Sequence, residues 1–461
     1  MKARIVIAVV LGTALGGCMV GPDYRRPDVV VPPEYKEAGA WKPAQPADNA
    51  ERGAWWKTFS DPQLDVLEAQ LEIGNQNLRL AEAQYRQARA LVGQARSALF
   101  PSLSGSVSVT RSRSPASAAP TPSHVVSLDA SWEADLWGRV RRTVEANVAG
   151  AEASAADLAN ARLSAQAELA SDYFQLRVLD VQRQLFEDTV AAYRKSLVLT
   201  RNRYAVGVAG KVDVAQAQAQ LTSTQAQAID LGVARAQLEH AIAILLGKAP
   251  AQFSLPRASI AIGMREIPPG LPSQLLERRP DIAAAERRVA AANAQIGVAK
   301  SAFFPDLTLS ASGGFQSSSV ANWISAPNRF WALGPALAQS IFDAGLRSAL
   351  SEQAIAAYDA SVASYRQTVL GAFQEVEDNL AALRILGDEA KVQEDAVRAA
   401  RESVTLTTNQ YKAGTVDFLS VVTVQATQLA NERATVVTYG QRLVAEVALI
   451  KALGGGWQAP R

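Results

Sequence analysis

The sequence is poor in the residues from which disulfide frameworks, metal centres and many active sites are built. Its 461 residues include one cysteine, Cys18, and two histidines, His124 and His240. One cysteine excludes a disulfide framework, and two distant histidines form no cluster with the spacing of metal ligands. No Gly-rich phosphate loop is present either. We therefore expect no metal, no cofactor and no enzymatic activity.

A dominant charge and long apolar runs are also lacking. The 46 basic and 44 acidic residues leave a net charge of +2, which indicates no polyanionic partner such as a nucleic acid. Beyond the N-terminus, no segment has the ~18 uninterrupted apolar residues of a membrane helix. If this chain crosses a membrane, the sequence predicts that it does so through a β-barrel.

The N-terminus has the pattern of a bacterial export signal. Lys2 and Arg4 precede an apolar run from Ile5 to Leu15, and small residues lead to Cys18. The run Leu15-Gly16-Gly17-Cys18 resembles a lipobox, which predicts a signal peptide over 1–17 and a covalent lipid on Cys18. We expect the proline-rich residues 18–60 to be extended.

The chain is a tandem duplication. Residues 97–103 (SALFPSL) recur at 301–307 (SAFFPDL), and Tyr204-Ala205-Val206-Gly207 recurs as Tyr411-Lys412-Ala413-Gly414. Units of about 200 residues exclude small solenoid repeats. The boundaries that we expect are a first repeat over 61–247, a connector over 248–272, a second repeat over 273–453 and a tail over 454–461.

Each repeat contains a helix, a β-hairpin and two long helices. Asp61-Pro62 is a helix start, and the apolar pattern continues to about Leu99. Strict alternation of apolar and polar residues then predicts hairpins within 101–137 and 304–342. The segments 139–206 and 347–413 lack proline, and a helix of that length would extend roughly 100 Å.

The four strands have one apolar face and one face rich in serine and acidic residues. A four-stranded sheet cannot close on itself, so it either packs on another layer or is shared among several chains in one barrel. In a barrel that spans a membrane, the polar face would line the lumen. The residues alone leave both arrangements open.

Short motifs along nearly the whole chain resemble one family. They are Gly21-Pro22-Asp23-Tyr24 after Cys18, Trp55-Trp56, Asp61-Pro62, Phe100-Pro101-Ser102-Leu103, Arg279-Pro280-Asp281-Ile282, Phe304-Pro305-Asp306-Leu307 and the ending Lys451-Ala452-Leu453-Gly454-Gly455-Gly456-Trp457. With the duplication, this order resembles the TolC-like outer membrane factors, and among them the OprM-type (NodT subfamily) lipoproteins of tripartite RND efflux systems.

The resemblance implies a mainly α-helical homotrimer in the outer membrane. Each chain would give four strands to a shared β-barrel in the membrane lipids, and its helices to a long periplasmic tunnel. The turns at Gly207 and Gly414 would form the tip at which a periplasmic adaptor docks, and an inner-membrane RND pump would supply the energy. The channel would be a passive exit duct for drugs and other small molecules.

The resemblance also implies a gate close to these turns. The expected gate residues are Leu419, Thr423, Gln216, Asp213 and Asp417. Relatives often have an aspartate ring where this chain has Thr423, with Gln216 at the equivalent place in the first repeat. This departure suggests a gate held by apolar contacts and hydrogen bonds, or a threonine that only packs between helices.

Two other functions fit parts of the sequence. One is an exit duct of a type I protein secretion system, which would keep the fold but change the partners. The other is a structural lipoprotein that spaces the envelope with its long helices. The alternating hairpins argue against a spacer, since a spacer needs no amphipathic sheet.

Overall fold

The structure is a computed structural model that describes residues 19–37, 53–113, 119–259 and 279–455. The chain divides into two compact units, each built from segments of both repeats. The first unit combines Met1–Val29, Glu82–Asp157 and Asp281–Thr368, and the second combines Val30–Ala81, Leu158–Pro280 and Val369–Arg461. The signal peptide over 1–17 and Cys18 lie outside the described residues.

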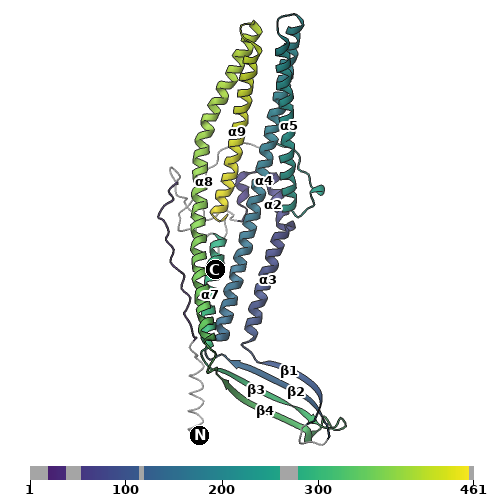
Figure 1. Ribbon diagram of the computed structural model, residues 1–461, viewed down its shortest axis with the longest axis vertical. Helices are drawn as coiled ribbons and strands as arrows, with labels where there is room; N and C mark the ends of the chain where they lie inside the picture. The colour runs from purple at the N-terminus through teal and green to yellow at the C-terminus, as the bar shows by residue number, and fades with distance from the viewer. Residues whose placement is uncertain (1–18, 38–52, 114–118, 260–278, 456–461) are drawn as a thin grey trace. The chain divides into compact units, whose positions relative to one another are not determined.

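The first unit contains one antiparallel sheet, drawn as four arrows in Figure 1. Its strands follow the order of the chain, β1-β2-β3-β4. The sheet is therefore a simple meander in which β1 and β4 are the two edges. The bounds are β1 Ser102–Ser112, β2 Thr121–Ala134, β3 Asp306–Ser317 and β4 Arg329–Ala338.

The register places apolar side chains of all four strands on one face. Val107 pairs with Val126, which pairs with Phe315 on β3, and Gly313 pairs with Trp331 on β4. Because side chains alternate along a strand, the intervening residues share the opposite face. On β1, β2 and β3 that face is lined mainly by serines, and Ser106 and Ser127 contact each other across it at 2.9 Å between hydroxyl oxygens, whereas β4 places Phe330 and Ala332 there. The two hairpins expected from the sequence are confirmed, and β1, β2 and β3 have the expected polar and apolar faces, whereas β4 is largely apolar on both faces.

The long helices form two hairpins, as the sequence predicts. In the first repeat, α4 (Arg139–Ala205) turns back into α5 (Lys211–Leu245); in the second, α8 (Leu346–Ala413) turns back into α9 (Phe418–Ala452). In the second unit, Figure 1 shows α4 beside α5 and α8 beside α9. No helix in the described ranges is both long and apolar enough to cross a membrane.

The first helix of the repeat is interrupted, in contrast to the continuous pattern expected up to Leu99. It is divided into α2 (Pro62–Gly74) and α3 (Gln76–Ser97), with the buried Asn75 between them. The Asn75 side-chain amide donates to the Leu245 carbonyl at 2.8 Å, and its oxygen accepts from the Leu78 amide at 3.0 Å. Asn75 therefore caps α3 and fixes the break against the end of α5.

Close packing of two glycine backbones accompanies the interruption between α2 and α3. A Cβ on Gly74 would lie 2.1 Å from the Leu246 carbonyl oxygen, and a Cβ on Gly247 would lie 2.0 Å from the Gly74 oxygen. The two backbones can approach this closely only because both residues are glycines.

The remaining short or separate helices are η1 Trp55–Phe59, η2 Pro250–Gln252, η3 Ala326–Asn328 and α7 Pro280–Ser301.

The main core of the second unit surrounds α2. Leu64, Leu67 and Leu71 are at most 1% exposed, and they pack with aromatic and aliphatic side chains of η1, α4, α5 and α9. Asp61 caps α2 through the amides of Gln63 and Leu64, at 2.9 and 3.2 Å, and accepts a bond from Tyr173 on α4 at 2.7 Å. The cap therefore orients α2 and joins it to the long helices.

Candidate functional site

The candidate site is the pair of turns at the ends of the helical hairpins, here called the tips. Gly207 and Gly414 have backbone φ angles of 77° and 81°. In each turn the glycine amide donates a hydrogen bond to the carbonyl three residues earlier, and the amide of the next residue donates one to the carbonyl five residues before it. The four donor–acceptor distances are 2.9–3.1 Å. This is the Schellman termination of a helix, which favours glycine at the positive φ. Both tip glycines are therefore needed for the chain reversal.

The two tips begin their returning helices with reciprocal capping bonds, in which the donor and acceptor positions of the first tip are exchanged in the second. In the first tip, Asp213 in the first turn of α5 accepts from the Gly210 amide at 3.1 Å. In the second tip, Asp417 precedes α9 and accepts from the Ser420 amide at 3.0 Å and the Ser420 hydroxyl at 2.6 Å. The repeated Tyr-X-X-Gly motifs lie 207 residues apart in the chain. At this offset Gly210 aligns with Asp417, and Asp213 aligns with Ser420.

These contacts give the two expected gate aspartates a capping position. The bond from the Ser420 hydroxyl, followed by that from its amide, lowers the pKa of Asp417. A carboxylate that accepts bonds from the start of a helix is favoured in its ionised form. The structure therefore places Asp213 and Asp417 at helix N-termini, where each stabilises its own tip.

Leu419 and Thr423 lie one turn apart on α9. The Leu419 side chain is 51% exposed, and the exposed Thr423 donates its hydroxyl to the Leu419 carbonyl at 2.9 Å. Gln216 is half-buried on α5, in the other hairpin. Within one chain, the structure brings Leu419 and Thr423 together and leaves both accessible to another molecule.

A small core joins the two hairpins behind the tips. It contains seven buried side chains from all four long helices, namely Tyr193, Leu197, Ala217, Leu221, Tyr411, Phe418 and Val421. The Tyr411 and Phe418 rings meet edge to face, with centroids 5.4 Å apart. Such pairs add modestly to the burial of their surface, so the tips rest on few contacts.

Arg203 is the functional candidate that the sequence reasoning missed. Its guanidinium lies over the Tyr411 ring at 4.7 Å and donates to the Lys412 carbonyl at 3.0 Å. The end of α4 is thereby bound to the end of α8. One signal was present in the sequence, because the second repeat has Gln410 where the first repeat has Arg203.

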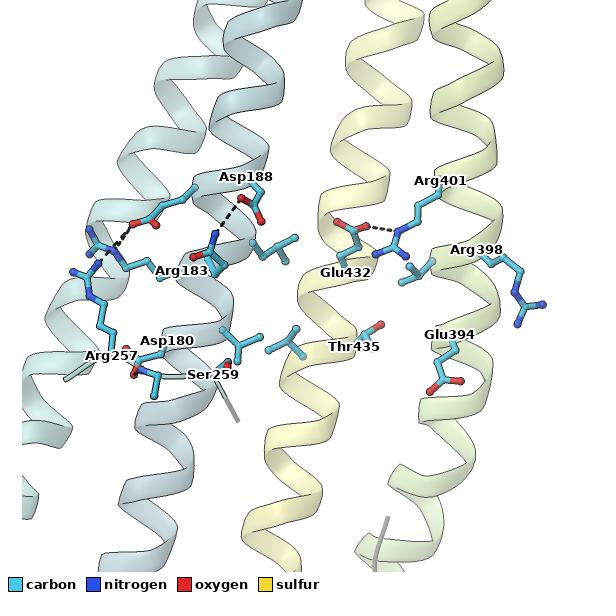
Figure 2. Close-up of a pocket in the computed structure, with 17 residues that line it drawn as sticks. Asp180, Arg183, Asp188, Arg257, Ser259, Glu394, Arg398, Arg401, Glu432 and Thr435 are labelled. Carbon is cyan, nitrogen blue, oxygen red and sulfur yellow. Dashed lines mark hydrogen bonds and ion pairs between the residues drawn. The ribbon is translucent and has the colours of Figure 1, made fainter. Parts of the chain in front are cut away.

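A groove of about 1010 Å³, lined by many charged side chains, lies farther from the tips in the same unit. Figure 2 shows Asp180, Arg183 and Asp188 on one side and Arg398, Arg401 and Glu432 on the other. Most of its charged groups are paired locally, as in Arg401–Glu432 at 2.7 Å and Arg183–Glu187 at 2.9 Å. Among the described residues, no group of three His, Cys, Asp or Glu side chains could hold a metal ion.

Comparison with known proteins agrees with this architecture. The model of the outer membrane efflux protein family matches twice, over residues 67–248 and 271–455. The probable efflux pump outer membrane protein TtgC of Pseudomonas putida is 32% identical, over 99% of this chain and 96% of its own. The two family matches correspond to the two repeats of the sequence.

Solved structures agree over nearly the whole chain. The outer-membrane channel OprN is 33% identical with a TM-score of 0.89, over 96% of this chain and 100% of its own. The open-state MtrE outer membrane channel of Neisseria gonorrhoeae is 28% identical with a TM-score of 0.86, over 96% and 99%. The predicted TolC-like fold, outer-membrane location and efflux function are confirmed. The chain belongs to the outer membrane efflux protein family, whose members are channels of efflux pumps.

Proposed function

We propose that three copies of this chain form one passive exit duct of a tripartite pump. The observation that carries the proposal is the amphipathic sheet with two open edges. All residues of β1 are exposed, and β4 is exposed at most positions. Open edges expose unpaired backbone groups, and pairing β4 of each copy with β1 of the next closes twelve strands into a barrel.

The faces of the sheet fit this assembly. The serine-rich face would line a water-filled lumen, and the apolar face would contact the membrane lipids. Leu103, Val107, Trp331 and Leu333 on the apolar face are each at least 70% exposed in a single chain. Burial in lipid would remove these side chains from water, and it would stabilise the barrel.

The N-terminal segment supports a lipid anchor on Cys18. The Val20 amide donates to the Trp137 carbonyl at 3.0 Å, and Arg142 contacts Asp23 at 2.9 Å. Both contacts hold the residues after Cys18 beside the helix that follows β2. A lipid on Cys18 would thus begin where the strands leave the membrane. A Cys18→Ala variant should lose the mass of the lipid while it still inserts.

The tips are the proposed docking surface for a periplasmic adaptor that connects to an inner-membrane RND pump. Around Gly207, the apolar side chains Tyr204, Val206, Val208 and Val212 are 47–74% exposed. Such a patch is unusual for a surface that contacts only water. Together with Gly414, these residues would provide an apolar contact surface at the end of the tunnel.

The same tips would contain the gate. In a trimer, Leu419 and Thr423 of three copies would surround the duct, closed by apolar contact and hydroxyl groups. Gln216, Asp213 and Asp417 would contribute from neighbouring turns, the two aspartates chiefly as helix caps. This gate would lack a ring of facing carboxylates at position 423, and would therefore respond weakly to cations.

Disulfide crosslinking between the sheet edges tests the trimer. In a Cys18→Ala background, a cysteine at Val107 on β1 is combined in turn with one at Trp331, Leu333 or Pro335 on β4. Within one sheet these strands are about 14 Å apart, beyond disulfide reach. We expect a ladder of species that ends at three chains. Single-cysteine variants are the control, and monomers in every combination would contradict the shared barrel.

Crosslinking in living cells tests the partners. Cysteines at Val208 and Thr415 leave the tip glycines intact. Capture of the adaptor of a proton-driven pump would support small-molecule efflux. Capture of an adaptor of an ABC exporter would instead support protein secretion. Capture of neither, while control proteins crosslink normally, would contradict docking at the tips.

A further inference from the structure

The sheet has a strong asymmetry of charge between its two ends. At the helix end, where the strands join the helices, arginines are paired with carboxylates. Arg139 binds Glu133 with Nε at 2.9 Å, Arg141 binds Asp135 at 3.1 Å, and Arg347 binds Asp343. This end of the sheet is therefore close to neutral.

The loop end, where β1 joins β2 and β3 joins β4, has only positive charge. Arg111, Arg113 and Arg329 are exposed there, and no acidic residue occurs in 102–128 or 307–342. In the described part of the chain, no ion pair or hydrogen bond occupies these three guanidiniums. Three copies would therefore carry nine unpaired arginines at this end.

Two of these arginines lie on the apolar face of the sheet. Arg111 pairs with Pro122 and has the same parity along β1 as Val107. Arg329 pairs with Phe315, and it is two residues before the 78% exposed Trp331 on the same face. Each guanidinium thus lies at the end of a row of exposed apolar side chains, and in the proposed barrel Trp331 would lie where aromatic side chains meet lipid headgroups.

We propose that the loop-end arginines bind the phosphate groups of phosphorylated lipids in the outer leaflet. The inference rests on the proposed trimer, in which β4 of one copy pairs with β1 of the next. Arg329 and the neighbouring copy's Arg111 then lie on adjacent strands of the lipid-facing surface. Each seam between copies would present both guanidiniums, with Arg113 beyond the end of β1.

The chemistry favours phosphate over other lipid groups. A guanidinium offers a planar fork of donors that matches phosphate oxygens in a bidentate geometry. Partial desolvation at the membrane surface would strengthen each contact. Because Arg111 and Arg329 are far apart within one chain, with β2 and β3 between their strands, the complete site requires two copies.

Native mass spectrometry of the detergent-solubilised protein with diphosphorylated lipid A tests this site. The variant combines Arg111→Gln, Arg113→Gln and Arg329→Gln. A matched control removes the same charge from exposed arginines on α3, α4 and α8 through Arg86→Gln, Arg194→Gln and Arg366→Gln. We expect the loop-end variant to bind lipid A at least roughly tenfold more weakly, while the control binds like the wild type.

The same spectra separate the lipid site from the proposed trimer. The oligomeric state is read from the mass of the protein without lipid, and lipid binding from the adducts. Removal of the phosphates from lipid A should abolish the difference between the variants. Inorganic phosphate that displaced lipid A at equal concentration would identify a site for free phosphate and contradict the lipid. Equal binding of lipid A by the loop-end variant and the control would also overturn the proposal.

Discussion

The core around α2 and the tips belong to the same unit but are built in opposite ways. Around α2, twenty buried side chains, drawn mainly from η1, α2, α3, α4, α5 and α9, form one cluster. At the tips, seven side chains support two exposed turns. Burial of apolar surface is the main stabilising contribution in a folded chain. The core around α2 should therefore be the more stable region, and the tips are less densely packed, as the proposed gate would require.

Carboxylates show the same contrast. Glu68 on α2 is fully buried, and burial followed by the charges of Glu72 and Asp65 raises its pKa to about 9. Asp417 at the tip accepts bonds from Ser420, which lower its pKa. The core thus holds a neutral acid, neither oxygen of which has a hydrogen-bond partner among the described residues, while the tip uses an ionised carboxylate as a helix cap.

The largest expected effect comes from removing leucines in the two regions. Leu67→Ala leaves a cavity beside α2 and should lower the free energy of unfolding by about 3 kcal/mol. Leu419→Ala at the tip should change it by less than about 0.5 kcal/mol, because Leu419 is half exposed. Denaturation of both variants in detergent measures the difference, and equal losses would contradict the contrast.

The next effect concerns Glu68 and pH. Since the folded protein keeps this proton up to about pH 9 and the unfolded chain releases it near pH 4.5, stability should decrease as pH rises between these values. Glu68→Gln should therefore stabilise the protein at pH 8, and by much less at pH 5. Melting curves at both pH values measure it. Glu82→Gln, at an exposed position on α3, should change neither curve.

A smaller effect is expected at the gate itself. Thr423→Asp would place three facing carboxylates around the proposed duct, where their mutual repulsion favours a bound cation. We expect the concentration of divalent cations that half-blocks the channel to fall roughly tenfold. Single-channel recording measures this block. Gln216→Asp makes the same test at the equivalent position of the first repeat. Strong block of the wild type would contradict a gate without carboxylates.

The smallest effect is expected from the helix cap. Asp417→Ala removes the acceptor for the Ser420 amide, so the first turn of α9 should open more often. Hydrogen exchange at the second tip should become faster, while exchange at the first tip and around α2 remains unchanged. Asp213→Ala provides the reverse test, because it should affect only the first tip.

The sequence predicted the fold well where patterns are local. Alternation along β1 to β4 and the proline-free segments before Gly207 and Gly414 depend on neighbouring residues. The break at Asn75 was missed because it depends on Leu245 and Gly247, about 170 residues away in the chain. Contacts of this kind leave no periodic signal in a single sequence.

The candidate site was predicted less completely. The tip glycines followed from the repeated Tyr-X-X-Gly motif, and the structure adds their positive φ angles. The capping bonds of Asp417 could have been expected from its position before the apolar start of α9. The contacts of Arg203 could not, because its partners Tyr411 and Lys412 belong to the other repeat; the sequence shows only that the second repeat has Gln410 at the equivalent position.

If the tips contain the proposed gate, the contacts of Arg203 between the two hairpins should help to hold it closed. Single-channel recording of Arg203→Gln tests it most directly, with Arg201→Gln as the matched control. Arg201 also lies on α4, but it binds Gln218 within its own hairpin at 2.8 Å. We predict that loss of the contacts to Tyr411 and Lys412 increases the open fraction, while the control conducts like the wild type. Unchanged conduction in Arg203→Gln, or an equal increase in both variants, would contradict this account.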